Sequence, residues 1–406
     1  MRRIFFVNRY FPPDHSATSQ LVGDLASHLV RCGYSVTAVT SQQLYDQPQA
    51  LLPSYSVLNG VEIRRVPTTK FGRSNLLGRA ADYFSFYWSA RRFLLATAHR
   101  DDVIIAMTDP PLISVVAMDV ARRRGAHLLN WLQDLYPELA VELAVSFLKG
   151  PLPSTLSYLR DRSLKAAAAN IVVGQRMAEK VKGRGILPDR IHVVQNWTDD
   201  EEIRPSPPGE NLLRRKWGLD DKFVVGYSGN LGRVHEYDTV LAAAEQLREA
   251  SKIVFLCIGS GHLMLELAKR VKERCLENFR FYNYQPQDQL TLSLGIPDVH
   301  WISLNPKLEG CVVPSKFYGI AAVGRPVIAV CAKDGEISRL VNQYQCGVVI
   351  EPGDPGNLAK AITELSRNHD LRDRMGRNAR AMLDANFTRR QALASWQKLL
   401  DNIARS

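Results

Sequence analysis

Two segments in the second half of the chain combine residue types that bind anions. The first is the glycine-rich turn Gly226–Arg233, with the sequence GYSGNLGR. Glycines let backbone amides come close to a phosphate, and an arginine can pair with two phosphate oxygens. This combination predicts a site for a diphosphate. The alternative is an ordinary turn followed by a surface arginine.

The second segment, residues 305–319, runs from the end of an expected strand into an expected helix. Pro314 and Ser315 are typical of a helix start, where free N–H groups and the positive end of the helix dipole attract an anion, and Lys316 adds a full charge. Taken alone, Ser315 fits a simple cap equally well, and Lys316 fits a solvated surface charge. Taken with the glycine-rich turn, both predict positive charge directed at one place.

Apolar runs separated by helical stretches give the elements that position these residues. The runs occupy residues 4–7, 35–39, 103–106, 127–129, 171–173 and 191–194, and then 223–227, 253–258, 279–282, 299–302, 326–330 and 347–350. This alternation predicts an α/β fold of two doubly wound domains, each a parallel sheet covered on both faces. A Pro/Gly-rich stretch at 199–209 has the composition of a linker, so we place the domains at 1–204 and 205–386. Open α/β sheets bind ligands at the carboxyl ends of their strands, which predicts a site in a cleft between the domains.

Composition limits the class of protein. The 406 residues are 46% hydrophobic and 23% charged, as in ordinary soluble domains, and the net charge of +11 favours an anionic partner. The six cysteines lack CxxC spacing and no histidine cluster accompanies them, which disfavours a disulfide framework and a zinc site. The sequence also lacks an apolar run long enough to cross a bilayer, and its first apolar run is too short for a signal peptide. We expect a cytoplasmic, metal-free protein.

The order of five segments resembles that of a retaining glycosyltransferase of family 4 with the GT-B architecture. The segments are residues 193–197, 226–233, 258–261, 284–286 and 305–319. The sequences VPSK at 313–316 and WLQDLYPE at 131–138 are similar to those of bacterial polysaccharide and O-antigen transferases. The resemblance covers nearly the whole chain. It implies two facing Rossmann-like domains, the first binding the acceptor and the second the nucleotide sugar, with residues 387–406 as a helix that crosses back to the first.

The resemblance also implies roles for individual residues. Arg233 and Lys316 would hold the donor diphosphate in place of a metal ion, and Glu309 would hold sugar hydroxyls together with the backbone amides of residues 310–313. The full donor-binding set that it implies is Gly229, Asn230, Gly232, Gly259, Tyr284, Gln285, Gly310, Cys311, Val312, Val313 and Ser315.

The chain departs from the family pattern at two positions. The family's usual pair of glutamates is not intact, because Glu309 matches the first and the second aligns with Gly319. The glutamate that commonly holds the ribose hydroxyls is therefore expected to be absent. The lysine that often follows the loop arginine is also missing, since Asp238 stands near its place, and Lys316 is expected to supply that charge.

Asp134 stands where many family members carry a histidine facing the donor sugar. A carboxylate at this position is able to accept hydrogen bonds from sugar hydroxyls and to stabilise the positive charge that develops at the anomeric carbon. The alternative is that Asp134 caps the following helix. The Pro-rich loop near the start of the chain resembles the family's acceptor-side loop, with Ser16 and Ala17 as acceptor contacts. Asp14 and His15 fit turn residues slightly better than acceptor contacts.

Residues 70–100 mix basic and aromatic side chains. The stripe Leu76, Ala80, Tyr83, Tyr87 and Trp88 has helical spacing and is flanked by Lys70, Arg73, Arg79, Arg91, Arg92 and Arg100. This pattern is typical of a helix lying on an anionic membrane surface, at the inner face of the cell membrane, and also of a helix that is simply part of a core.

Taken together, these features predict a metal-independent hexosyltransferase without a cofactor. Its donor would be UDP-glucose or a related UDP-hexose, and its acceptor a soluble or lipid-linked saccharide in polysaccharide biosynthesis. A second hypothesis is a UDP-sugar 2-epimerase, because non-hydrolysing epimerases share this architecture. A nucleic-acid-binding module is suggested by net charge alone, and the sequence has no recognition helix, RNP-type strand or zinc finger to support it.

Overall fold

The computed structural model describes residues 3–45, 47, 49, 51–72, 76–143, 150–206 and 211–405. They form two compact units, one of Met1–Gln195 with Leu393–Ser406 and the other of Asn196–Ala392. The division falls after Gln195, whereas the sequence analysis placed it after Arg204. Of the features named above, Arg73, residues 207–209, the side chain of Leu76 and Ser406 lie outside the described residues.

Within the described part of the first unit, eight strands form one sheet in the order β3-β4-β2-β1-β5-β6-β7-β8. Only β3 runs antiparallel to its neighbour, β4, in this sheet of described strands. The strands are β1 (Arg3–Val7), β2 (Ser35–Ser41), β3 (Tyr55–Leu58), β4 (Val61–Val66), β5 (Val103–Ala106), β6 (His127–Leu132), β7 (Ala169–Val172) and β8 (Ile191–Val193). The central strands are buried along nearly their whole length, as a sheet covered on both faces requires.

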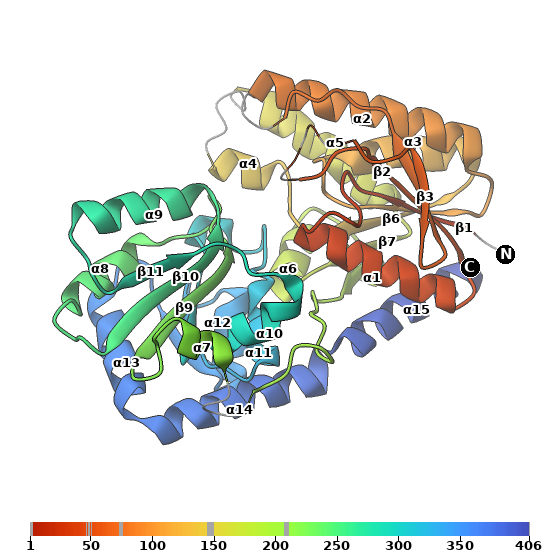
Figure 1. Ribbon diagram of the computed structural model, residues 1–406. Helices are drawn as coiled ribbons and strands as arrows, with labels where there is room; N and C mark the ends of the chain where they lie inside the picture. Colours follow the sequence, from red (N-terminus) through yellow and green to blue (C-terminus); the bar gives the residue numbers. More distant parts are fainter. Residues whose placement is uncertain are drawn as a thin grey trace. The chain divides into compact units, whose positions relative to one another are not determined.

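Helices cover both faces of this sheet, with α2, α3 and α5 in one layer and α1 on the other side (Figure 1). The helices are α1 (Ala17–Arg31), α2 (Leu76–Thr97), α3 (Ile113–Arg124), α4 (Glu138–Glu142), α5 (Leu152–Ala166), α6 (Gln175–Gly183) and α15 (Arg389–Arg405). Gly33 (φ 90°) follows the end of α1 and Gly125 (φ 68°) that of α3, because the left-handed conformation that ends a helix suits glycine. The doubly wound arrangement expected from the sequence is confirmed.

The last helix, α15, contributes its residues from Leu393 onward to the first unit. The ring of Trp396, which is fully buried, lies 4.7 Å from the ring of Trp131 on β6. The hydroxyl of Tyr34 also donates a hydrogen bond to Asp401. The end of the chain is therefore part of the core of the unit in which the chain begins.

The second unit contains a parallel sheet in the order β11-β10-β9-β12-β13-β14. Its strands are β9 (Phe223–Asn230), β10 (Ile253–Ser260), β11 (Phe279–Tyr282), β12 (Val299–Ser303), β13 (Val327–Val330) and β14 (Gly347–Ile350). Its helices are α7 (Leu212–Lys216), α8 (Asp238–Gln246), α9 (His262–Glu273), α10 (Leu290–Gly295), α11 (Lys316–Ala322), α12 (Glu336–Tyr344), α13 (Pro355–Arg367) and α14 (His369–Asn386). Short 3₁₀ turns occur at Pro188–Arg190 in the first unit and at Gln287–Gln289 and Pro306–Leu308 in the second.

Candidate active site

The carboxyl ends of β9 and β10 meet at a pair of glycines. Gly229 lies opposite Gly259 in the parallel register, with φ values of 123° and 129°. A Cβ on Gly259 would lie 2.3 Å from the carbonyl oxygen of Gly229, so no side chain fits there. The close approach of the two strands is therefore one reason for the glycine pair. Because neither residue has a side chain, the backbone is also uncovered at the edge where a diphosphate was predicted.

Lys316 lies directly over this glycine-lined edge. A Cβ on Gly229 would come within 2.6 Å of the lysine Cε, so the glycine makes room for the lysine stem. The ammonium nitrogen lies 5.4 Å from the centre of the Tyr227 ring. Burial lowers the pKa of Lys316 to about 8. The structure thus brings Lys316 and the glycine-rich turn together, as the sequence predicted.

Lys316 is also the first residue of α11, which has only 7 residues. Ser315 takes the N-cap position but makes no side-chain capping hydrogen bond. So short a helix contributes little macrodipole. We therefore attribute the positive potential at this edge mainly to the lysine charge.

His235 is a member of this site that the sequence analysis missed. It is buried in the loop between β9 and α8, with its Nδ1 2.6 Å from the carbonyl oxygen of Ser303 and its Nε2 3.4 Å from Nζ of Lys316. Burial and the nearby ammonium of Lys316 lower the pKa of His235 to about 3. The only sequence signal for this role was its position, three residues after Gly232 of the glycine-rich turn and two after Arg233.

Arg233 belongs to the same loop and is exposed. Among the residues that the structure describes, no carboxylate forms an ion pair with Arg233 or with Lys316. Asn230 ends β9, and Gly232 is half-buried beside it. Two cations on adjoining segments therefore lack a counter-ion of their own, which is the electrostatic condition for binding an anion.

Glu309 is already engaged with the start of α12. Its Oε2 accepts a hydrogen bond from the backbone N–H of Glu336 at 3.3 Å, and a Cβ on Gly335 would lie 2.3 Å from its Oε1. The carboxylate of Glu309 thus stabilises the start of α12. The same carboxylate would have to keep this structural role while it contacts sugar hydroxyls.

The backbone expected to hold the sugar is only partly available. The N–H of Cys311 donates to the carbonyl oxygen of Leu308 at 2.9 Å, so this amide already has a partner within the chain. Gly310 (φ 72°) and Val313 are buried beside it, and Val312 is half-buried.

The expected base-binding loop follows β11. Tyr284 is 52% exposed, and the Nε2 amide of Gln285 donates to the carbonyl oxygen of Asn283 at 2.9 Å. Next to it, the rings of Tyr282 and Trp217 stack 3.7 Å apart. This part of the unit presents an exposed aromatic ring on a braced loop, which suits stacking against a planar base.

Gly319 lies inside α11 with room for a side chain. A Cβ there would be 3.6 Å from Cδ1 of Leu294 and 4.0 Å from Oγ1 of Thr198, which are ordinary van der Waals contacts. The glycine is not imposed by packing, and the position provides no carboxylate for a ribose.

Asp134 lies in the first unit, just after β6. Burial, together with the smaller effect of the neighbouring Asp109, raises the pKa of Asp134 to about 7. The N-cap of α4 is Pro137, which excludes Asp134 as the cap of that helix. A carboxylate with a raised pKa, outside the helix cap, fits a functional group better than a structural one.

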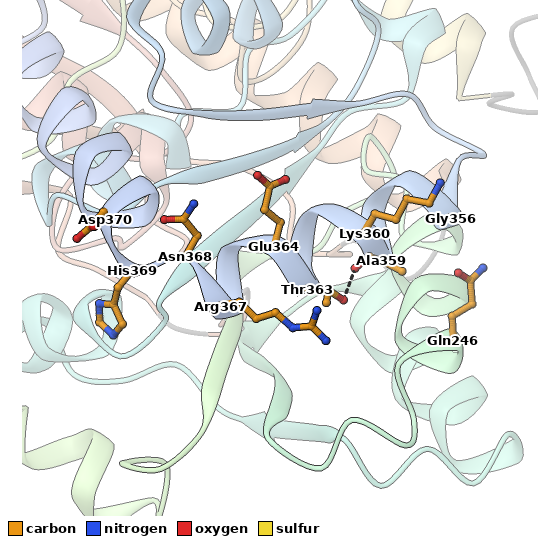
Figure 2. Close-up of a pocket in the computed structure, with 10 residues that line it drawn as sticks. All are labelled: Gln246, Gly356, Ala359, Lys360, Thr363, Glu364, Arg367, Asn368, His369 and Asp370. Atoms are coloured by element: carbon orange, nitrogen blue, oxygen red, sulfur yellow. Dashed lines mark hydrogen bonds between the residues drawn. The ribbon is translucent and has the colours of Figure 1, made fainter.

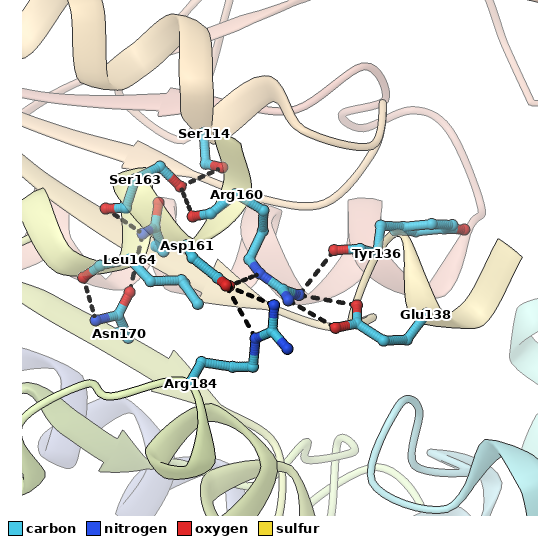
Figure 3. Close-up of polar contacts among 10 residues, drawn as sticks. Ser114, Tyr136, Glu138, Arg160, Asp161, Ser163, Leu164, Asn170 and Arg184 are labelled. Atoms are coloured by element: carbon cyan, nitrogen blue, oxygen red, sulfur yellow. Dashed lines mark hydrogen bonds and ion pairs between the residues drawn. The ribbon is translucent and has the colours of Figure 1, made fainter. Parts of the chain in front are cut away.

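Arg160 fixes the segment that carries Asp134, and the sequence analysis did not identify it (Figure 3). Its guanidinium donates to the carbonyl oxygen of Tyr136 at 2.8 Å and to both carboxylate oxygens of Glu138 at 3.0 and 2.7 Å. Its Nε donates to Asp161, which also pairs with Arg184. This buried guanidinium is paired with carboxylates, in contrast to Lys316 and Arg233 of the second unit.

In the loop where acceptor contacts were expected, Asp14 is a turn residue. Its carboxylate accepts hydrogen bonds from the backbone N–H groups of Ser16 at 2.8 Å and Tyr45 at 2.6 Å. Ser16 precedes α1, which begins at Ala17, and its half-buried hydroxyl has no partner among the described residues. Asp14 therefore shapes the loop on which Ser16 and Ala17 lie.

A surface pocket of about 920 Å³ opens elsewhere on the second unit, along α13 (Figure 2). Its lining mixes charges, with Lys360, Glu364, Arg367 and Asp370 spread along the helices, and no predicted site residue lines it. These charges do not point to one place where a ligand could bind, so we place the candidate site at the carboxyl ends of β9 and β10.

Comparison with known proteins identifies the family. A model described as "Glycosyl transferases group 1" matches residues 210–382, and one described as "Glycosyl transferase 4-like domain" matches residues 17–197. The chain belongs to the group 1 glycosyltransferases. The resemblance found in the sequence is confirmed.

Relatives in sequence, and solved structures of other proteins, align with nearly the whole length of this glycosyltransferase. It is 26% identical to the probable glycosyltransferase WbjE of Pseudomonas aeruginosa, over 96% of this chain and 95% of the relative. It is 24% identical to the putative colanic acid biosynthesis glycosyl transferase WcaI of Escherichia coli K12, over 87% and 89%. The structure of Anabaena Alr3699/HepE in complex with UDP and glucose covers 100% of both chains with a TM-score of 0.73 and 17% identity, which shows the GT-B fold.

No group of three or more His, Cys, Asp or Glu side chains within the described ranges is arranged to hold a metal ion. No helix in the same ranges has both the length and the apolar character needed to cross a membrane.

The raised pKa of Asp134 predicts a pH-dependent stability. The folded state binds a proton more tightly than the unfolded state does, so the free energy of unfolding should fall as pH rises from about 4 to 7. The neutral Asp134→Asn variant should escape this loss. We expect it to be more stable than wild type by roughly 1–2 kcal/mol at pH 8, discounted because the side chain is partly exposed, and equal to it near pH 4.

Urea unfolding at both pH values measures this difference, with the exposed Asp220→Asn as the matched control. An Asp134→Asn variant that is less stable than wild type at pH 8 would contradict the assignment of a carboxylate whose pKa is raised by burial.

Proposed function

We propose that this glycosyltransferase moves a hexosyl unit from UDP-glucose or a related UDP-hexose to a glycan or lipid-linked saccharide during polysaccharide biosynthesis. The observation that carries the proposal is the pair of cations Lys316 and Arg233 at the carboxyl edge of β9, for which the described residues provide no counter-ion. An anion with two or more charges completes this arrangement, and the diphosphate of a nucleotide sugar meets that requirement.

The nature of the donor and acceptor is supported by the relatives. HepE has been solved in complex with UDP-glucose, and WcaI is named for colanic acid biosynthesis. The exposed ring of Tyr284 suits a planar base such as uracil.

The proposed chemistry is a displacement that retains the anomeric configuration. Lys316 and Arg233 stabilise the departing diphosphate, which takes most of the negative charge, so no metal ion is needed at this step. Glu309, with backbone groups of the segment from Gly310 to Val313, orients the sugar. A phosphate oxygen of the donor accepts the proton of the acceptor hydroxyl, because no second carboxylate of the kind used by retaining hydrolases is available. Asp134 stabilises the developing oxocarbenium charge.

The test is turnover of a panel of UDP-hexoses with a lipid-linked saccharide, in excess EDTA. We expect release of UDP with retention of the anomeric configuration, and a fall in kcat/KM of about 10²-fold or more for Arg233→Ala, by analogy with loss of one charge-stabilising donor. Arg377→Ala, at an exposed position of α14, is the matched control. Strict dependence on manganese or an inverted product contradicts the mechanism. Interconversion of the UDP-hexose without acceptor would indicate an epimerase.

The exposed face of α2 supports contact with an anionic membrane. Leu77 is 84% exposed, Phe84 71% and Trp88 69%, and their spacing places them on one side of the helix. Arg92 continues the same face. A lipid surface with negative headgroups matches this combination, because apolar rings insert while the guanidinium pairs with phosphate.

This exposed face differs from the stripe expected in the sequence. Tyr83 and Tyr87 are half-buried, and the Tyr87 hydroxyl donates to the carbonyl oxygen of Pro111. Arg91 pairs with Asp119 on α3. Among the described side chains of the stripe, only Trp88 lies on the exposed face, which the neighbouring Leu77 and Phe84 complete.

We expect Phe84→Ser with Trp88→Ser to weaken binding to vesicles of phosphatidylglycerol and phosphatidylcholine at least tenfold in a sedimentation assay, since two inserted rings are lost. Leu265→Ser, which removes a 76% exposed side chain from α9, is the control and should bind as wild type does. Equal binding of the double variant and the control would remove α2 as the contact surface.

A further inference from the structure

The orientation of the His235 ring is fixed from two sides. Its Nδ1 is 2.6 Å from the carbonyl oxygen of Ser303, at the end of β12, and its ring meets the Tyr227 ring edge-on, with centres 5.8 Å apart. A carbonyl oxygen only accepts, so Nδ1 carries the hydrogen. Because burial and the charge of Lys316 lower the pKa of His235 to about 3, the imidazole is neutral and Nε2 is the acceptor.

The acceptor nitrogen faces the ammonium of Lys316. Nζ lies 3.4 Å from Nε2 and donates to it, while the lysine stem runs over Gly229 and the charge lies 5.4 Å from the Tyr227 ring centre. Each of these neighbours is uncharged. They fix the place of the ammonium without cancelling its charge.

The choice of a neutral acceptor has an electrostatic consequence. A carboxylate in the place of the imidazole would hold the ammonium equally well, but it would form an ion pair and compete with an anionic ligand. A neutral imidazole leaves the full charge for the ligand.

We propose that His235 is a positioning residue, whose neutral imidazole, oriented by the Ser303 carbonyl, holds the ammonium of Lys316 as an unpaired receptor for a diphosphate. This inference rests on the proposed function and deepens it. His235 itself does not touch the ligand and acts through Lys316.

The test is the affinity for inorganic pyrophosphate, measured by calorimetry on the full chain. His235→Phe keeps a ring against Tyr227 but removes both nitrogens, and should weaken binding roughly tenfold, the effect of losing one hydrogen bond to a charged group. His235→Gln retains an oxygen acceptor and should recover most of that loss. His235→Asp also retains an acceptor but adds a charge, and should bind more weakly than His235→Gln.

A double-mutant cycle separates positioning from general structural damage. In the Lys316→Met background, His235→Phe should cause no further loss of pyrophosphate affinity. An equal loss in both backgrounds, or His235→Asp binding as tightly as wild type, overturns the role of His235.

The cycle also separates this inference from the proposed function. If Lys316→Met leaves pyrophosphate affinity unchanged, the diphosphate site itself is contradicted. If Lys316→Met weakens binding and His235→Phe does not, only the positioning role fails.

Discussion

Burying part of an ammonium group without a counter-ion lowers stability, because the charge loses hydration and gains no partner. Lys316 is in this situation at the carboxyl edge of the second unit, and burial lowers its pKa to about 8. Several neighbouring residues are explained by the need to hold that charge in place. Gly229 leaves space for the lysine stem, Tyr227 offers the face of a ring, and His235 provides a neutral acceptor.

Two buried arginines of the first unit, Arg9 and Arg160, are instead paired with carboxylates. Arg9 and Asp82 form an ion pair with side-chain exposures of 2% and 0%, and Asp82 also accepts hydrogen bonds from the backbone N–H groups of Phe71 and Gly72. Arg160 is similarly saturated by Tyr136, Glu138 and Asp161. These pairs fix loops, and their partners leave no net charge for a ligand. The contrast explains why we place the anion site in the second unit and assign the paired arginines to structure.

The sequence predicted the repetitive features of the fold well. All twelve apolar runs coincide with strands, since buried parallel strands are continuous runs of branched residues. The hairpin β3–β4 was missed, although its Asn59-Gly60 turn, with φ values of 50° and 81°, is a known hairpin signal. In the site, Lys316 and the glycines followed from local sequence, because each acts through its own backbone segment.

Long-range contacts were not predictable from the sequence in the same way. The partners His235 and Lys316 are 81 residues apart, and Arg160 is 22 residues from Glu138. Neither spacing carries a periodic signal. The expected stripe on α2 included Tyr83 and Tyr87, whereas the exposed aromatic residues are their neighbours Phe84 and Trp88. Both sides of the helix carry aromatic residues, so only the burial seen in the structure distinguishes them.

The central claim is that the ammonium of Lys316 is an unpaired charge that receives a diphosphate. Its pKa reports both properties and is measurable by NMR on protein carrying ¹³C-labelled lysine, with Lys316→Met to assign the signal. We expect a pKa of about 8 in the free protein, and a higher value with saturating UDP, because an adjacent anion favours the charged form. A pKa that UDP leaves unchanged would contradict the account.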